Sequence, residues 1–395
     1  MGEWFNKRMD EIAEFNPRES IPKGTIAKKI AMEKLQPFCR DVPGYELEAF
    51  AGGSKFRNGD TIMARITPCL ENGKTAKVDI LEEDEVGFGS TEFIVFRAKD
   101  GNDPDFIYYL VTSPIIREPS IKSMVGSSGR QRVQTDVVQS IIVRVPGLKE
   151  QQEIAGILKS LDDKIVANRR INENLEQQAQ TIFRSWFIDF TPFGGDAPSD
   201  WVSTTLGSVC SCELGGTPSR AKPEYWNGYI PWINSGEVNK FRITKPSETI
   251  TELGLSKSAT KLLPAKTTVI AITGATLGQV SLLEIESCAN QSVVGVVPNP
   301  TLPYEFIYPF ITANIQELIS HQTGGAQQHI NKQNVESLPI VVPSEEILKE
   351  YVGLVGSIYA SIANNCFENE HLADIRDSLL PRLMSGELDV SGLDL

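Results

Sequence analysis

The side chains that most often carry catalysis are sparse in this sequence and poorly spaced. Its three histidines form no HExxH-type metal pattern, and its six cysteines include no CxxC pair, so the spacing of a zinc site or a disulfide framework is missing. We therefore expect free thiols, no metal site, and histidines that cap helices or face solvent. These residues are His321, His329 and His371, and Cys39, Cys69, Cys210, Cys212, Cys288 and Cys366.

Two short segments resemble parts of catalytic motifs, but their companion elements are absent. Asn72–Thr75 resembles the end of a phosphate-binding loop, yet Pro68 stands where that loop needs its first glycine. Ser258–Lys261 has SxxK spacing, and no SDN or KTG element follows it. We interpret the first as a hairpin turn and the second as coincidence. With no dinucleotide fingerprint, GxSxG elbow or amino-methyltransferase motif, the sequence predicts a chain without catalytic residues.

The composition favours a multidomain globular protein. The 395 residues are 41% hydrophobic and 23% charged, which predicts two or three domains. A net charge of -13 disfavours nonspecific coating of nucleic acid or of an anionic membrane, although it leaves sequence-specific DNA binding open. No apolar run approaches membrane-spanning length and the first residues do not form a secretion signal, so we expect a soluble, cytoplasmic protein.

An internal repeat organises the chain. The segment 126–146 resembles 323–343, and the same offset of 197 residues, which joins Pro146 to Pro343, continues without a gap into the sequences that follow. It aligns Asn168 with Asn365 and Leu175 with Leu372. The sequence therefore predicts two divergent copies of one unit.

The first part of each copy, residues 1–145 and 203–343, has the pattern of a compact α+β domain. Short β-branched runs alternate with Gly, Pro and Asn turn signals, and one helix is expected in each copy. The expected strands lie at 61–66, 92–97, 140–145, 267–273, 292–298 and 338–342, and the expected helices at 104–112 and 303–320.

The second part of each copy has the pattern of a long amphipathic helix. Between 149 and 187 there is no proline and only one glycine, and the seam positions step alternately by four and three. We predict a spacer helix at 146–190, a turn-rich linker at 191–202, and a second helix and tail at 344–395, kinked or ended by Pro381. The seam positions are Ile154, Leu158, Leu161, Ile165, Asn168, Asn172, Leu175, Ala179, Ile182 and Trp186, then Tyr351, Val355, Ile358, Ile362, Asn365, Asn369, Leu372, Arg376, Leu379 and Leu383.

Two asparagines interrupt each seam at equivalent positions. Polar core residues of this kind cost stability unless a partner satisfies their amides. An antiparallel crossing would pair Asn168 with Asn369 and Asn172 with Asn365, and would thereby fix the register of the two helices. The alternative is that these asparagines merely relax a solvent-exposed seam.

Several motifs give the chain a family resemblance. It resembles the specificity subunits of type I restriction-modification systems, whose target-recognition domains open in a similar way. The first copy matches less literally, because Glu14–Arg18 stands in place of the GGTPS segment, and its assignment depends on the repeat. The motifs are Leu206–Cys210, Gly215–Ser219 (GGTPS), Glu224–Gly228 (EYWNG), Ile230–Ile233 (IPWI) and Leu379–Gly386 (LLPRLMSG).

The resemblance implies a non-catalytic subunit with two pseudo-twofold-related target-recognition domains, 1–145 and 203–343, joined by antiparallel helices. Each domain would read one half of a bipartite, asymmetric site in double-stranded DNA, and the helices would dock two methylation subunits. Restriction subunits complete such complexes. Adenine-N6 methylation with S-adenosylmethionine, and ATP- and Mg-dependent cleavage, belong to those partners, so we expect no cofactor in this chain.

Base and phosphate contacts are expected from basic and amide side chains in loops. Arg130, Arg132, Gln327 and Gln328 recur at matching places in both copies, which suits phosphate contacts or internal hydrogen bonds better than base reading. We expect Tyr225, Trp226, Tyr229 and Trp232 to be core residues rather than base-stacking ones. The other candidates are Lys55, Arg57, Arg65 and Lys74 in the first domain, and Arg220, Lys222, Asn234, Ser235, Lys240 and Arg242 in the second.

Two other functions are compatible with the sequence. The chain could be the recognition module of a fused restriction-methylation enzyme or another phage-defence system, which a neighbouring gene with methylase motifs would distinguish. It could also be a coiled-coil scaffold without DNA affinity, which sequence-specific DNA binding would exclude.

Overall fold

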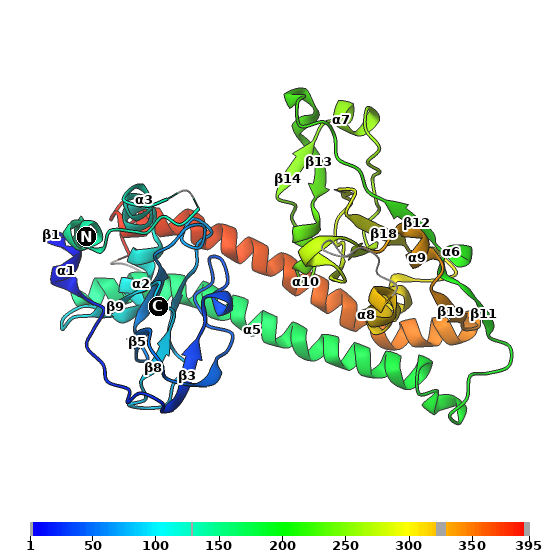
Figure 1. Ribbon diagram of the computed structural model, residues 1–395, viewed down its shortest axis with the longest axis horizontal. Coiled ribbons are helices and arrows are strands. Elements are labelled where there is room, and N and C mark those ends of the chain that lie inside the picture. The colour runs from blue at the N-terminus through cyan, green and yellow to red at the C-terminus, as the bar shows by residue number, and fades with distance from the viewer. Residues whose placement is uncertain (1–2, 128, 321–328, 391–395) are drawn as a thin grey trace. The chain divides into compact units, whose positions relative to one another are not determined.

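The computed structural model describes residues 3–127, 129–320 and 329–390 (Figure 1). Contacts between residues divide the chain into two compact units: unit 1 comprises 1–167 and 371–395, and unit 2 comprises 168–370. Two helices of 40 residues each, α5 (Leu148–Phe187) and α10 (Glu345–Met384), contribute a segment to both units. The unit boundaries therefore cut across these helices, and the domain boundaries drawn from the sequence stay predictions.

Unit 1 is an α+β domain with two four-stranded sheets and a separate strand pair. One sheet has the order β2-β9-β6-β7 and is antiparallel, whereas the order β4-β3-β8-β5 includes one parallel pair, β3 with β8. Strand β1 pairs with β10. The elements are β1 (Phe5–Arg8), α1 (Met9–Ile12), β2 (Ala13–Phe15), β3 (Ile26–Ile30), β4 (Glu46–Ala49), β5 (Ser54–Phe56), β6 (Thr61–Ala64), β7 (Thr75–Lys77), β8 (Gly87–Gly89), β9 (Phe93–Ala98), α2 (Pro104–Thr112), α3 (Pro114–Lys122), α4 (Thr135–Ser140) and β10 (Ile142–Val145).

Helix α2 lies at the centre of the unit 1 core. The Asp103 carboxylate caps its N-terminus by accepting a hydrogen bond from the Phe106 amide, and Pro104 suits the first turn. Its apolar residues pack against the start of α5 and the end of α10. We expected Pro381 to kink or end the second helix, but α10 continues past it to Met384. A proline in the last turn removes only one helical hydrogen bond, and the buried Leu383 and Met384 stabilise the extension.

Unit 2 repeats this architecture. Its sheets have the orders β12-β18-β15-β16 and β14-β13-β17, and β11 pairs with β19. Helix α8 packs with Phe183 of α5 and Tyr351 of α10 in the largest core cluster of this unit. The elements are β11 (Val202–Thr205), α6 (Leu206–Val209), β12 (Ser211–Leu214), β13 (Trp226–Ile233), β14 (Glu248–Ile250), α7 (Glu252–Ser256), β15 (Thr268–Ala271), β16 (Val280–Leu282), β17 (Cys288–Ala289), β18 (Val293–Val297), α8 (Tyr304–Ser320), α9 (Lys332–Glu336) and β19 (Pro339–Val342).

The structure contains the internal repeat. In β1 and β10, Phe5 pairs with Val145, and in β11 and β19, Val202 pairs with Val342, so both partners keep the offset of 197 residues. Each of the six expected strands and both expected helices has a counterpart within a few residues of the predicted bounds. All twenty predicted seam positions are buried or half-buried. The α+β fold class with two repeated domains and two long helices is therefore confirmed.

None of the helices in the described ranges combines the length and apolarity that crossing a membrane requires. The six cysteines all lie in the described ranges, and none of them forms a disulfide.

Candidate nucleic-acid interface

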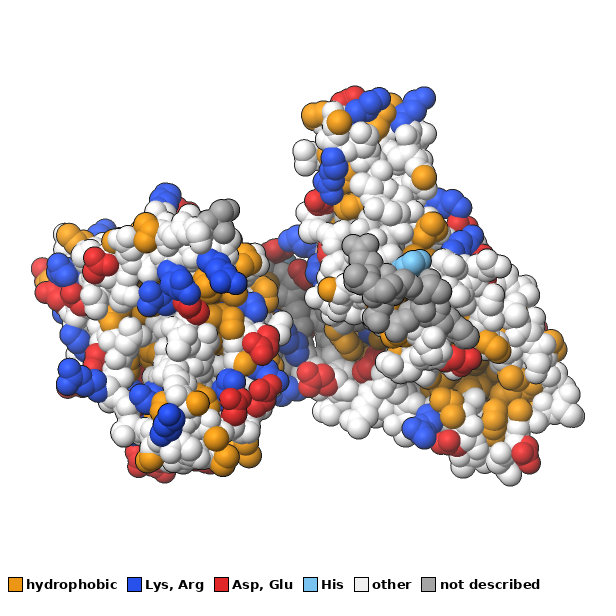
Figure 2. Space-filling view, viewed as in Figure 1, with side chains coloured by type: hydrophobic (Ala, Val, Ile, Leu, Met, Phe, Trp, Pro, Cys, Tyr) orange, Lys and Arg blue, Asp and Glu red, His pale blue; other side chains and the backbone are white. Residues whose placement is uncertain are grey.

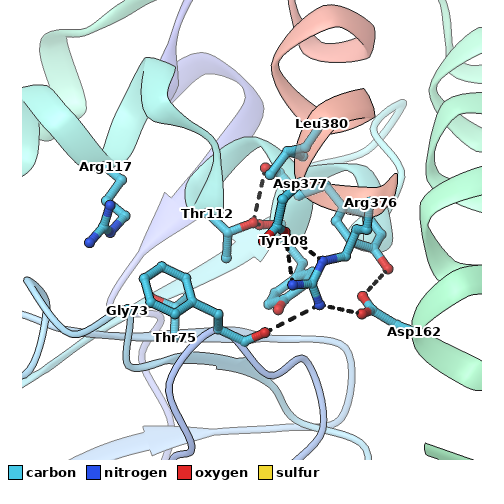
Figure 3. A pocket seen from close by; sticks show the side chains of 11 residues that line it. Gly73, Thr75, Tyr108, Thr112, Arg117, Asp162, Arg376, Asp377 and Leu380 are labelled. Atoms are coloured by element: carbon cyan, nitrogen blue, oxygen red, sulfur yellow. Dashed lines mark hydrogen bonds and ion pairs between the residues drawn. The ribbon is translucent and has the colours of Figure 1, made fainter. Parts of the chain in front are cut away.

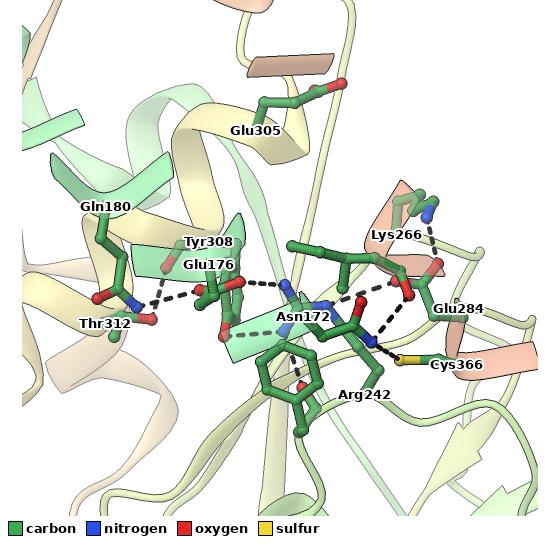
Figure 4. A network of polar contacts seen from close by, with 12 residues as sticks. Asn172, Glu176, Gln180, Arg242, Lys266, Glu284, Glu305, Tyr308, Thr312 and Cys366 are labelled. Atoms are coloured by element: carbon green, nitrogen blue, oxygen red, sulfur yellow. Dashed lines mark hydrogen bonds and ion pairs between the residues drawn. The ribbon is translucent and has the colours of Figure 1, made fainter. Parts of the chain in front are cut away.

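Arg242 was a candidate for DNA contact, and the structure removes it from that set. Its side chain is only 1% exposed and forms the centre of a polar network in unit 2 (Figure 4). The guanidinium donates to Glu176 of α5 at 2.6 Å and to the Tyr308 hydroxyl at 3.1 Å, and lies 3.6 Å from Glu284. Burial disfavours the charge, but Tyr308 and Glu176 more than offset it, so the pKa of Arg242 is raised. Arg242 thus fastens the recognition domain to α5.

A different set of charges fastens unit 1 to the helices. Arg376 of α10 donates to Asp162 of α5 at 2.7 Å and to the Phe38 carbonyl at 3.2 Å, and the Tyr109 hydroxyl donates to Asp162 at 2.7 Å (Figure 3). These groups border a cavity of about 40 Å³. Ligand pockets are usually several hundred Å³, so this cavity has no room for a nucleotide.

Arg65 and Arg132 come together around one carboxylate. Arg132 donates to both carboxylate oxygens of Glu92, with its shortest contact at 2.6 Å, and Arg65 lies 3.9 Å from the same group. The hydrogen bonds from Arg132 hold the pKa of Glu92 below its ordinary value. Glu92 was not among the residues predicted from the sequence, because its partner Arg132 lies 40 residues away along the chain.

The equivalent place in unit 2 has different chemistry. In unit 1, Arg132 forms an isolated backbone β-bridge with Ile66, the second residue after β6. In unit 2, His329 forms the equivalent β-bridge with Thr273, the second residue after β15. The positions that correspond to Arg65 and Glu92 hold Ile272 and Ser292. Gln327 and Gln328 lie outside the described residues.

The other unit 1 candidates are engaged to different degrees. Arg57 donates to Glu19 at 2.7 and 3.1 Å, and these bonds lower the pKa of Glu19, so Arg57 is a structural residue. Lys74 donates to the Met32 carbonyl at 3.0 Å. Lys55 lies 5.3 Å from the Phe50 ring centre. Arg130 is exposed, and its backbone amide donates to the Ser127 carbonyl at 3.0 Å.

Two unit 2 candidates lie on a rigid aromatic base. The Arg220 guanidinium lies 3.5 Å from the ring centre of Trp226 and donates to Glu248 at 2.6 Å, and Lys222 donates to the Tyr225 hydroxyl at 3.1 Å. Both cations are exposed. They are therefore oriented by their neighbours and still accessible to a ligand.

The remaining unit 2 candidates have local structural partners. Asn234 caps a short 3-10 helix, and its side-chain oxygen accepts from the Gly236 amide at 2.8 Å. Lys240 donates to Glu237 at 3.1 Å. Ser235 is half-buried beside this cap.

The expected asparagine pairs are present between α5 and α10 in unit 2. Asn168 donates to the Asn369 side-chain oxygen at 2.9 Å, and Asn365 donates to the Asn172 side-chain oxygen at 2.8 Å. Because Asn168 and Asn172 are buried, the alternative of a solvent-exposed seam does not fit. The two helix segments are antiparallel here and share this register.

The GGTPS segment has a structural role. A Cβ at Gly215 would lie 2.1 Å from the Asn290 carbonyl oxygen, so only glycine permits this approach of two backbones. The Trp232 indole donates to the Gly216 carbonyl at 3.1 Å. The segment thus positions Arg220, which follows it directly.

The basic side chains do not form one continuous surface. On the face drawn in Figure 2, acidic side chains lie among the basic ones over both units. Binding of a nucleic acid at this surface would depend on selected, oriented cations more than on a broad positive field.

Comparisons with known proteins are consistent with this geometry. The model of the family described as "Type I restriction modification DNA specificity domain" matches residues 1–177 and 198–364, one match for each copy of the repeat. The type I restriction enzyme HindI specificity subunit of Haemophilus influenzae is 26% identical, over 88% of this chain and 89% of the relative. The MjaIX specificity subunit of Methanocaldococcus jannaschii is 27% identical, over 75% and 71%.

A solved structure shares the fold. The S subunit of a type I restriction-modification system from M. genitalium aligns over 97% of this chain and 96% of that chain, with a TM-score of 0.53 at 14% sequence identity.

Proposed function

This chain belongs to the family of type I restriction-modification specificity subunits, and from that premise we propose that it reads a bipartite, asymmetric site in double-stranded DNA. The recognition domain of unit 1 reads one half-site, and that of unit 2 reads the other. The chain itself supplies no catalysis.

The proposal of two unlike half-sites is based on the different residues that the two domains hold at equivalent loop positions. The frame is the same in both domains, since β1 with β10 and β11 with β19 keep one register, but equivalent loop positions differ in chemistry. Arg65, Glu92 and Arg132 correspond to Ile272, Ser292 and His329. Side chains with different donors and acceptors on one frame suit the reading of different base edges.

The helices offer a surface for partner subunits. Ile171 of α5 and Leu354 and Phe367 of α10 are exposed apolar residues of unit 2. We assign them to the docking of methylation subunits, two per complex, with restriction subunits joining the same assembly. Those partners would bind S-adenosylmethionine, ATP and Mg, methylate adenine at N6 and cleave DNA. Such a complex acts on chromosomal DNA in the cytoplasm.

Methylome sequencing tests the proposal. A host carrying this gene with its neighbouring methylase gene should show a bipartite adenine-methylated motif that a host with the methylase gene alone lacks. Replacing residues 203–343 by the equivalent segment of a relative should change one half of the motif and leave the other half intact. No motif, or a change in both halves, would contradict the proposal.

A further inference from the structure

Residues 219–232 and 247–261 of unit 2 form an arm that carries most of β13, together with β14 and α7, whereas the segment between them packs into the unit core through Ile233, Val238 and Ile243. In Figure 1 the arm extends away from the rest of its unit, with α7 near its free end. A small cluster, in which Tyr225, Trp226, Trp232 and Ile250 are buried, joins the arm to Cys288 of β17. The Trp226 indole also donates to the Ser219 carbonyl at 3.3 Å. A projection packed in this way is a stiff element that can present a side chain at a fixed position.

Tyr229 does not belong to that cluster, contrary to our expectation from the sequence. It is 72% exposed, the largest exposed fraction among the large hydrophobic residues that the structure describes. Within β13, Trp226, Ile230 and Trp232 are buried in this cluster, whereas Asn227 and Tyr229 are exposed. A tyrosine ring in water is unfavourable, so a partner surface would gain from covering it.

The backbone forces Tyr229 outward. Trp226 and Ile230 both pair with Ile250, so the three residues between them form a bulge. Asn227 adopts a left-handed conformation with φ of 60°, and a Cβ at Gly228 would lie 2.4 Å from the Ile250 carbonyl oxygen. The Tyr229 hydroxyl donates to the Glu252 carboxylate, which links the bulge to α7. Bulges often redirect a side chain toward a ligand, and strained backbone is typical of functional sites.

Charge identifies the kind of partner. The arm carries four Lys and Arg against three Glu, whereas the rest of unit 2 carries nine against seventeen Asp and Glu. Near the free end, Lys222 and Lys257 are exposed, and Leu253 is an exposed apolar residue next to Glu252. Glu224 and Glu252 also lie there as opposing charges. Figure 2 shows hydrophobic and basic side chains together at this end, with an acidic one among them. An arm with a net positive charge on an otherwise acidic unit favours a polyanion as its partner.

We propose that the end of this arm binds double-stranded DNA, with Tyr229 inserted as a wedge between adjacent base pairs while Lys222 and Lys257 contact the flanking phosphates. Apolar and aromatic wedges of this kind unstack one base step and bend the duplex. The inference rests on the proposed function and adds to it, because the wedge favours easily unstacked pyrimidine–purine steps and so contributes specificity without reading a base edge. A protein partner fits less well, since a single aromatic among lysines lacks the apolar area of a stable interface.

The test uses the full chain assembled with its methylation subunits and a duplex that carries the motif found by methylome sequencing. 2-Aminopurine is placed in turn at each purine of the half-site that depends on 203–343 and of its flanks. The wild-type complex should raise the fluorescence at one step. Tyr229→Ala should abolish that rise and weaken binding by about fivefold or more, because stacking of one base on an aromatic ring contributes about 1–3 kcal/mol.

Two variants serve as controls. Tyr229→Phe keeps the ring and loses only the hydroxyl, so it should retain both the fluorescence rise and the affinity. Phe5→Ala removes a similarly exposed ring from unit 1 and should change neither. Thermal unfolding should be unaltered in all three variants, since none of these rings is buried.

Two results would overturn the wedge. In the first, Tyr229→Ala keeps wild-type affinity and fluorescence. In the second, it loses the methylation subunits on purification, which would make the arm a protein-binding element. Either result leaves the proposed function intact as long as the motif still depends on this gene, whereas absence of the motif contradicts the proposed function itself.

Discussion

Arg242 illustrates what a buried ion pair means at the scale of one residue. Two carboxylates, Glu176 and Glu284, and one phenol surround a guanidinium that water does not reach. Such a pair adds little compared with a well-packed apolar group, but removal of one partner leaves a charge buried without compensation. Arg242 is therefore important for stability because its removal would leave the buried carboxylates of Glu176 and Glu284 with less compensating charge.

We expect Arg242→Met to lower the free energy of unfolding of unit 2 by about 3–5 kcal/mol, because the buried Glu176 carboxylate would lose the cation that balances its charge. Urea unfolding followed by tryptophan fluorescence measures this. Arg220→Met is the matched control, since Arg220 is exposed and should cost less than about 1 kcal/mol. Equal costs for the two variants would show that the network is not important for stability.

Sequence reasoning at this scale was limited by burial. Arg57, Arg132 and Arg242 are of a residue type that commonly contacts DNA, yet each forms an ion pair with a carboxylate that is distant in sequence. The positions of charged residues in the sequence do not show which carboxylate lies near each arginine in the folded protein. Tyr229 was predicted to be a core residue, and the bulge between Trp226 and Ile230 that turns it outward was not predicted.

At the scale of elements, the residue pattern predicted those helices and strands whose formation depends on residues close together in the sequence. The heptad steps predicted α5 and α10, and the paired asparagines predicted their register, because helix seams repeat within a few residues. The arm was not predicted as an element. Strand β13 pairs with β17 in parallel through a long connection, and such a pairing leaves no short-range signal.

The asparagine pairs between α5 and α10 allow a test of whether they fix the register of the two helices. Asn172→Leu leaves the Asn365 amide without its acceptor, and we expect a loss of about 1–3 kcal/mol in the free energy of unfolding. In the double variant Asn172→Leu, Asn365→Leu, both polar groups are gone and apolar burial should recover most of that stability. Chemical denaturation of the two variants and the wild type measures the difference. A double variant as unstable as the sum of its single changes would show that the pair does not act as a unit.

At the scale of the whole molecule, the net charge of -13 and the arginines already paired with carboxylates both indicate that few free cations are left to bind DNA. Glu19, Glu92, Glu176 and Asp162 already bind arginine side chains within the protein, so few cations remain to displace counterions from DNA. We therefore expect the chain to obtain specificity from oriented groups and to need its partner subunits for much of the affinity.

This balance predicts a difference in salt dependence. Each phosphate neutralised by a protein steepens the slope of log affinity against log salt by about 0.9. We expect the chain alone to bind DNA weakly with a shallow slope, and the complex with methylation subunits to have a slope steeper by about two units or more, which corresponds to two or more added phosphate contacts. Fluorescence anisotropy from 50 to 300 mM salt, roughly the range in which counterion release is measurable, gives both slopes. Equal slopes would mean that this chain alone makes the phosphate contacts, through exposed cations such as Arg130, Lys222 and Lys257, and that its partners add contacts of another kind.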